Sequence, residues 1–297
     1  MSQPSRDDDL ADFKDRLRCA KEHQDADRME PARAEYLQAL AFAEKHFGPN
    51  STEVDQVCLD LALFHGQLKE SAEELQALER RVRIRKAEAG IPQVVDALQD
   101  VAECHKAQER PEAAEATYRE ALGLCDESIE VHRQALRMTL LYFGVFLNDL
   151  ERHEEAISVL ERGLGVCKRE QEPPTFTAAR TAMHLGEALL HAKRRTEAAT
   201  LIEAAAPVVC HRSQTPSTHF GKVLYYLGNY YQREGRHDDA ARAYELAIQQ
   251  THNARRVNYR NFAYIQQAAA ANDLKLNQTA RAEFRLRQAV RFLLRSQ

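Results

Sequence analysis

Residues 224–247 read LYYLGNYYQREGRHDDAARAYELA, and the architecture follows from this stretch. Apolar residues at helical spacing form one face of a first helix: Leu224, Leu227 and Tyr231. Gly228 lets a neighbouring backbone approach that face, and Gly235 breaks the helix. A second helix then carries small and bulky residues on its inner face: Ala240, Tyr244 and Ala247. The stretch therefore predicts a helix–turn–helix unit.

The alanine that opens this second face returns at a nearly constant interval. Its positions are Ala32, Ala72, Ala114, Ala156, Ala198, Ala240 and Ala282, with every step 42 residues except the first, which is 40. A second recurring residue follows four positions later: Tyr36, Gln76, Tyr118, Leu160, Ile202, Tyr244 and Leu286. A further recurring feature, an apolar residue followed by a small one, begins thirteen positions before each alanine; this landmark is clearest as Leu185-Gly186 and Leu227-Gly228. In the second unit it fits at Leu59 or Leu61. Seven units are thus predicted to form a single array over residues 13–297, after a disordered acidic N-terminus at residues 1–12.

The pattern Leu-Gly-x2-Tyr followed by Ala-x3-Tyr-x2-Ala resembles the tetratricopeptide repeat (TPR), a helix–turn–helix unit that stacks into a solenoid. The 42-residue period, with Glu44 to Pro49 joining the first two units, is similar to the repeats of kinesin light chains and their bacterial relatives. The Asn-Asn pair common before Leu-Ala in those repeats is missing here. The resemblance implies an all-α, right-handed superhelical α-solenoid of about seven TPR repeats.

Composition agrees with a packed, helical protein. The apolar fraction is 44%, and no apolar run approaches the ~18 residues needed to span a bilayer. The segment Met1 to Asp15 is acidic and shows no targeting leader, so a cytoplasmic location is expected. Cys125, Cys167 and Cys210 recur at about the repeat interval, where stacked helices lie too far apart for disulfides, so reduced thiols are expected.

Charge is distributed unevenly along the chain. Residues 1–148 carry a net charge of −10 and residues 149–297 one of +6. This separation of charge creates an electric field that steers charged partners. The basic run from Arg80 to Lys86 closes a predicted helix, where cations complement the helix dipole, so a solvated helix end is favoured over a nucleic-acid site. Neither nucleic acid nor a membrane is predicted as a partner.

The resemblance to TPR arrays implies that the first helix of each unit lines a concave binding surface. By position, this surface is acidic in unit three (Asp96, Asp100), apolar in unit four, and basic with aromatics in units five to seven. The predicted partner-binding residues are Arg180, His184, Lys222, Tyr225, Tyr226, Asn229, Arg233, Tyr264, Gln267 and Asn272. Asn229 and Asn272 are placed at equivalent repeat positions, where an asparagine often contacts a peptide backbone. The alternative is that the tyrosines pack between units while the cations are solvated.

The sequence signals for a metal site or a catalytic site are weaker than those for a binding surface. His184, Glu187 and His191 share one helix face and can in principle hold a metal, but the sequence places no fourth ligand beside them, so no metal or cofactor is predicted. No phosphate-binding loop, nucleophile elbow or zinc-protease motif is present, and no enzyme activity is predicted.

The predicted function is therefore a protein–protein interaction adaptor or scaffold that takes up an acidic or aromatic-bearing partner segment in its groove. One alternative is a peptide-responsive sensor whose superhelix changes curvature. A second is a metal-dependent enzyme that uses His184 and Glu187. Self-association is a further expectation for the C-terminal helix, because it combines arginines with Phe284, Leu286 and Val290.

Overall fold

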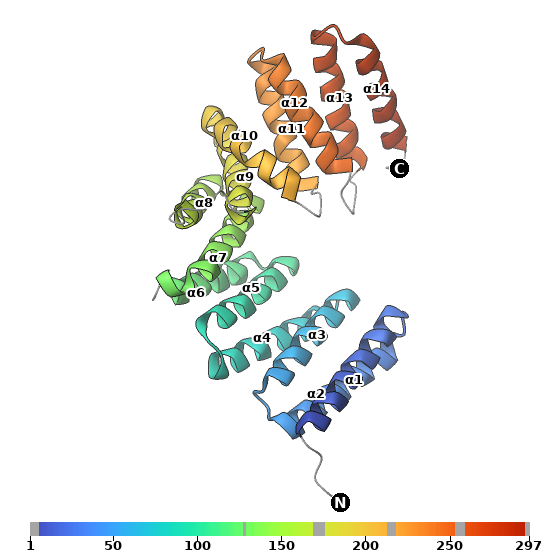
Figure 1. Ribbon diagram of the computed structural model, residues 1–297, viewed down its shortest axis with the longest axis vertical. Coiled ribbons are helices and arrows are strands. Elements are labelled where there is room, and N and C mark those ends of the chain that lie inside the picture. The colour runs from blue at the N-terminus through green and yellow to red at the C-terminus, as the bar shows by residue number, and fades with distance from the viewer. Residues whose placement is uncertain (1–5, 127–128, 169–175, 213–217, 253–258, 295–297) are drawn as a thin grey trace, which may run out of the picture. The chain divides into compact units, whose positions relative to one another are not determined.

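The computed structural model describes residues 6–126, 129–168, 176–212, 218–252 and 259–294. These residues form fourteen α-helices and no strand, as predicted (Figure 1). The helices are α1 Arg6–Asp25, α2 Met29–Phe47, α3 Thr52–Leu68, α4 Ser71–Glu88, α5 Ile91–Ala107, α6 Pro111–Asp126, α7 Ile129–Asp149, α8 His153–Lys168, α9 Phe176–His191, α10 Arg195–Arg212, α11 Thr218–Arg233, α12 His237–His252, α13 Tyr259–Lys275 and α14 Thr279–Leu294.

The chain divides into two compact units, residues 1–139 and 140–297, with the division inside α7. In the first unit α1 packs on α2, α3 on α4 and α5 on α6; in the second α9 packs on α10, α11 on α12 and α13 on α14. The second unit also brings α9 into contact with α11, and α11 with α13. Figure 1 shows α11 to α14 side by side. The single continuous array over residues 13–297 stays a prediction.

The turn between the two helices of each pair contains a residue with a left-handed backbone, two positions before the second helix begins. The left-handed residues are Asp27, Lys69, Glu109, Glu151, Lys193, Gly235 and Asn277, with φ between 55° and 75°. The amide of the following residue donates to the carbonyl five positions back, as Arg236 does to Tyr231 at 2.9 Å, which is the helix-ending Schellman hydrogen bond. The turns recur every 42 residues except between Lys69 and Glu109, where the step is 40.

These turns correct the predicted register of the second repeat. In other repeats the core alanine lies five residues after the left-handed residue, so the equivalent of Ala32 is Glu74 and not Ala72. Ala72 and Gln76 are exposed, whereas Leu78 is buried and takes the place of Tyr36. The landmark is then Leu61 rather than Leu59, and the short step falls between the second and third repeats.

Glycine explains how a glutamate occupies an alanine position. A Cβ added to Gly66 on α3 would lie 3.0 Å from Glu74 Oε1, so the missing side chain makes room for the carboxyl group. Burial raises the pKa of Glu74.

The N-terminus also differs from its prediction. α1 begins at Arg6, so residues 6–12 are helical and the predicted disorder is wrong there; residues 1–5 lie outside the described residues. Asp7, Asp8 and Asp9 occupy the first turn, where carboxylates complement the helix dipole. Phe13 and Leu17 then pack into the core with Tyr36. The acidity that suggested disorder instead suits a helix start.

The basic run on α4 is only partly solvated, contrary to the prediction. Arg81 is buried, with its guanidinium contacting Asp55 at 3.4 Å, Asp96 at 3.3 Å and also Asp100. Arg85 contacts Asp55 at 3.0 Å and Asp96 at 2.7 Å. These two arginines therefore tie α3, α4 and α5 together.

The last helix presents apolar side chains on two sides. Phe292 packs against Phe262, with ring centres 4.6 Å apart, and so closes the core of the final pair. Phe284, Leu286, Val290 and Leu294 are exposed. Self-association through this helix stays a prediction.

Candidate partner-binding surface

The predicted binding residues of the second unit come from α9, α11 and α13. Most gather around Tyr226 on α11, whose side chain lines two adjoining pockets. The pockets follow from the repeat, because α9, α11 and α13 are first helices in contact and their outward positions fall side by side.

The first pocket has a volume of 300 Å³ and lies between α9 and α11. It is lined by Leu190, His191, Arg195, Tyr226, Asn229, Tyr230 and Arg233. The ring of His191 meets the Tyr226 ring edge-on at 5.7 Å and stacks on His153 at 4.4 Å. Burial, with the neighbouring His153, lowers the pKa of His191. The positive charge of this pocket therefore comes from Arg195 and Arg233.

The second pocket has a volume of 150 Å³ and lies between α11 and α13. It is lined by Lys222, Tyr225, Tyr226, Asn261, Tyr264 and Ile265. Lys222 Nζ lies 5.6 Å from the centre of the Tyr226 ring, within the range of a cation–π contact. Tyr225 and Tyr226 contact each other with ring centres 5.6 Å apart. We call the residues lining the two pockets the tyrosine surface.

Tyr244 of α12 supports the tyrosine surface through a hydrogen bond to Asn229, one of its residues. Burial raises the pKa of Tyr244, so its hydroxyl is protonated and shares its one proton between Asn229 Oδ1 at 2.8 Å and Gln232 Oε1 at 3.0 Å. These bonds fix the carbonyl side of Asn229. The tyrosine at the recurring core position thus orients a residue of the tyrosine surface.

Not every predicted residue belongs to this surface. Asn272 is 0% exposed, and its amide nitrogen donates to the His237 carbonyl at 2.9 Å, so the predicted role in binding is wrong. The reason is the helical phase of Asn272, that is, the direction in which its side chain points around the helix axis. Asn272 follows Asn229 by 43 residues, one more than the period, and one residue rotates a helical side chain by about 100°.

Three other predicted residues also lie outside the two pockets. Arg180 packs over the Phe176 ring at 5.9 Å, and Gln267 is exposed on α13. His184 is buried, so the prediction that it faces a ligand in the groove is wrong. Its repeat equivalent is Tyr226, 42 residues later, but the imidazole turns toward α11 instead.

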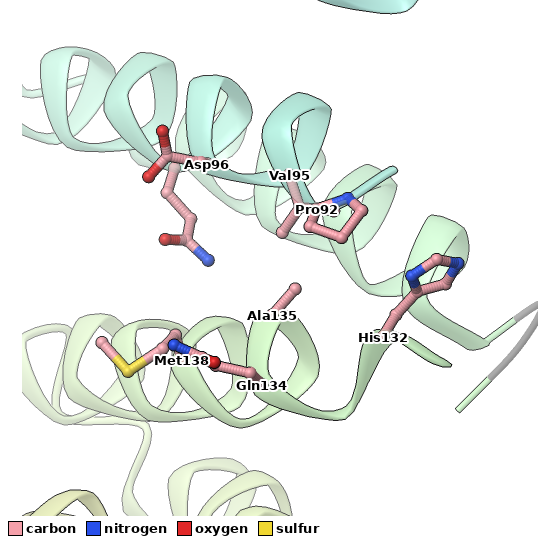
Figure 2. Close-up of a pocket in the computed structure, with 8 residues that line it drawn as sticks. Pro92, Val95, Asp96, His132, Gln134, Ala135 and Met138 are labelled. Carbon is pink, nitrogen blue, oxygen red and sulfur yellow. The ribbon is translucent and has the colours of Figure 1, made fainter. Parts of the chain in front are cut away.

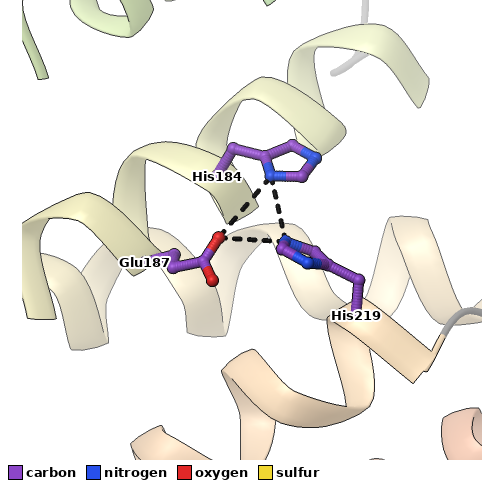
Figure 3. Close-up of side chains that lie close together, drawn as sticks. All are labelled: His184, Glu187 and His219. Atoms are coloured by element: carbon purple, nitrogen blue, oxygen red, sulfur yellow. Dashed lines mark hydrogen bonds and ion pairs between the residues drawn. The ribbon is translucent and has the colours of Figure 1, made fainter. Parts of the chain in front are cut away.

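His184 takes part in a cluster that the sequence only half predicted. His184 Nδ1 lies 3.2 Å from His219 Nε2 on α11, and Glu187 Oε2 lies 2.9 Å from the same His219 nitrogen (Figure 3). Burial lowers the pKa of His184. Burial acts to raise the pKa of Glu187, but the contacts with both histidines outweigh it and hold that pKa well below its usual range.

His219 was missed, and His191 was wrongly grouped with His184 and Glu187. A sequence signal for His219 exists: it lies seven residues, about two helical turns, before Tyr226, and therefore on the same helix face. Tyr226 is the repeat equivalent of His184. Side chains on this face of neighbouring first helices are candidates for contact, and comparing them across repeats would have found the pair.

The first unit has a separate pocket of 380 Å³ between α5 and α7 (Figure 2). Its lining includes Asp96 and Gln99 on α5 and Met138 on α7, and Asp96 was placed on the predicted concave surface. Asp96 is already paired with Arg81 and Arg85, and Gln99 donates to the Thr139 hydroxyl at 2.8 Å. The side chains of Asp96 and Gln99 are therefore already engaged within the chain.

No family model and no curated protein sequence matches the chain. Among solved structures, the apo form of RapI aligns with a TM-score of 0.63 at 11% identity, covering 95% of this chain and 97% of that one. BtubC (BKLC) from P. vanneervenii gives 0.61 at 16% identity, over 77% of this chain and 91% of that one. A putative kinesin light chain with nearly identical TPR-like repeats, from Podosopora anserina, gives 0.53 at 15% identity, over 72% of this chain and all of the other.

The chain has a tetratricopeptide-repeat fold. Within the second unit, α9, α11 and α13 are the first helices of their TPR repeats, and the tyrosine surface is built on them. None of the described helices combines the length and the apolar character needed to cross a bilayer.

Proposed function

We propose that this TPR chain is a protein–protein interaction adaptor, and that its tyrosine surface binds an acidic, aromatic-bearing segment of a partner protein. The observation that carries the proposal is the pair of adjoining pockets that share Tyr226 and are bordered by exposed cations. The similarity to TPR structures supports a binding role for first-helix surfaces, because side chains at these positions are presented on a rigid framework.

The chemistry of the surface defines the partner. Tyrosine rings offer large, rigid contact area, and aromatic and arginine side chains are enriched among residues that dominate binding energy. Lys222, Arg195 and Arg233 are exposed cations around those rings, so they favour carboxylates on the partner. A segment with an aromatic residue for a pocket and acidic residues beside it matches both features.

Selection from a random peptide library tests the proposal. Peptides enriched on the wild type should be rich in Asp or Glu together with an aromatic residue. The Lys222→Glu/Arg233→Glu variant should lose that enrichment, because it reverses two charges of the surface without altering a buried group. Recovery of the same peptides on both proteins would show that the tyrosine surface does not choose the partner.

The peptide-responsive sensor stays an alternative prediction. It uses the same surface and differs only in the change of shape that follows binding.

A further inference from the structure

The strongest unassigned feature of the second unit is the cluster of His184, Glu187 and His219. Two of these residues lie three apart on α9, and the third comes from α11, so the packing of two TPR repeats brings them together. Figure 3 shows the three side chains converging on one point. Their ligand atoms lie within 4.8 Å of one another, and they are the metal-competent cluster found among the described residues.

The spacing of the three atoms matches a metal centre. His184 Nδ1 and His219 Nε2 are 3.2 Å apart, His219 Nε2 and Glu187 Oε2 2.9 Å, and His184 Nδ1 and Glu187 Oε2 3.8 Å. A point equidistant from atoms with these separations lies about 2.0 Å from each, close to the Zn–N and Zn–O bond lengths. An ion therefore fits with shifts of a few tenths of an ångström.

Hydrogen bonding alone leaves the cluster incompletely satisfied. Glu187 is buried, and its Oε2 makes no hydrogen bond of acceptable geometry although His219 Nε2 is 2.9 Å away. A proton on one imidazole nitrogen points at one acceptor at a time. A cation at the shared point interacts with both nitrogens and the carboxylate together, and so compensates the cost of burying a charged Glu187.

We propose that His184 Nδ1, Glu187 Oε2 and His219 Nε2 bind one divalent transition-metal ion, with Zn²⁺ as the expected occupant. Two imidazoles and one carboxylate select transition ions over Mg²⁺ and Ca²⁺, which prefer oxygen ligands. Three protein ligands leave a fourth position for water. That position is reached from the side of His219, whose side chain is 35% exposed, whereas those of His184 and Glu187 are each 7% exposed.

The site goes beyond the proposed function and does not depend on it. None of its three ligands lines either pocket of the tyrosine surface. The ion joins α9 to α11, so it stabilises the stacking of two neighbouring TPR repeats.

Zinc titration of the full, untagged chain tests the proposal. After removal of metal with a chelator, competition with a zinc-binding dye should show one Zn²⁺ per chain, and zinc should raise the melting temperature. His219→Ala and Glu187→Gln should each weaken zinc binding at least about tenfold and abolish the thermal shift. His191→Ala is the matched control, because this histidine lies on the same helix but outside the cluster, and the variant should bind zinc as the wild type does.

Two results would overturn the site. One is a wild type that takes up no stoichiometric zinc. The other is zinc affinity unchanged in both ligand variants, which would assign the metal to the cysteine thiols or other histidines. Should the buried Glu187→Gln substitution prevent folding, His219→Ala decides the matter, since His219 is the most exposed of the three ligands and circular dichroism verifies its fold.

Discussion

At the residue scale, single glycines set how closely the two helices of a repeat approach. Gly144, Gly186 and Gly228 recur at the 42-residue interval, each facing the bulky residue of the following helix: Leu160, Ile202 and Tyr244. A Cβ on Gly228 would lie 2.5 Å from Tyr244 Cε1, so the ring can pack only because the side chain is absent. The same ring holds Asn229 on the tyrosine surface.

Replacement of this glycine has a predicted cost. Gly228→Ala should destabilise the fold by about 1–3 kcal/mol, the usual range for overpacking a core. Gly123→Ala is the control: Gly123 is also helical, but a Cβ added there would meet no packed neighbour within 4 Å, so this change should stabilise by about 0.5–1 kcal/mol. Urea unfolding measures both. A neutral Gly228→Ala would contradict the close approach of α11 and α12.

A second residue-scale prediction concerns Glu70, at the turn between α3 and α4. Hydrogen bonds from Arg33 and His65, both 2.6 Å long, lower the pKa of Glu70 from 4.5 to about 2. Because the folded-state pKa is depressed, Glu70 stabilises the fold above the unfolded pKa, and this contribution is lost as pH falls from about 4.3 toward about 2.

Measuring stability against pH checks this assignment. Glu70→Gln should lower stability at pH 7 and flatten the decline between about pH 4.3 and 2, because the variant has no carboxylate to protonate there. Glu88→Gln, an exposed carboxylate at the other end of α4, should leave the curve nearly unchanged. If the Glu70→Gln and wild-type curves run parallel through this window, the two hydrogen bonds do not stabilise the charged form.

At the element scale, the buried arginine of α4 links three helices of the first unit. Arg81→Met should destabilise by about 2–3 kcal/mol, less than the 3–5 kcal/mol of fully buried pairs, because Asp96 and Asp100 are 60% and 40% exposed. Arg83→Met, on the exposed face of the same helix, should change stability by no more than about 0.5 kcal/mol. Equal effects of the two substitutions in chemical denaturation would mean that the ion pairs contribute little.

The elements themselves could be read from the sequence almost completely, because a repeated 42-residue spacing of small and bulky residues is a strong helical signal. The register of the second repeat could not. Alanine stands at position 72 by coincidence, while the true core position holds Glu74, and only the room left by Gly66 makes that possible.

The candidate site was predictable only in part. Aromatic and cationic residues on first helices led to both pockets, since their positions follow from the repeat. The prediction that Asn272 and His184 face a ligand was wrong, because the outward orientation of a side chain depends on its exact helical phase and on the neighbouring helix. His219 escaped notice because its partners come from a different repeat, and sequence distance gives no direct measure of such contacts.

At the scale of the whole molecule, charge is segregated along the chain. The excess of Lys and Arg in residues 149–297 accompanies the tyrosine surface, whereas residues 1–148 are acidic. A field of this kind favours association with an acidic segment and weakens as salt screens it over about 10 Å at 0.1 M. The partner proposed from the pockets therefore also suits the charge of the region that carries them.

The most direct test is the dissociation constant of a selected acidic, aromatic-bearing peptide for three proteins: wild type, Tyr226→Ala and Phe284→Ala. Tyr226 is shared by both pockets, whereas Phe284 is an exposed aromatic on α14 outside them. We predict that Tyr226→Ala weakens binding by about 2 kcal/mol or more, roughly 30-fold, as for a hot-spot residue, and that Phe284→Ala binds as the wild type does. Affinity should also fall with added salt. Equal affinity of all three proteins would contradict the assignment of partner binding to the tyrosine surface.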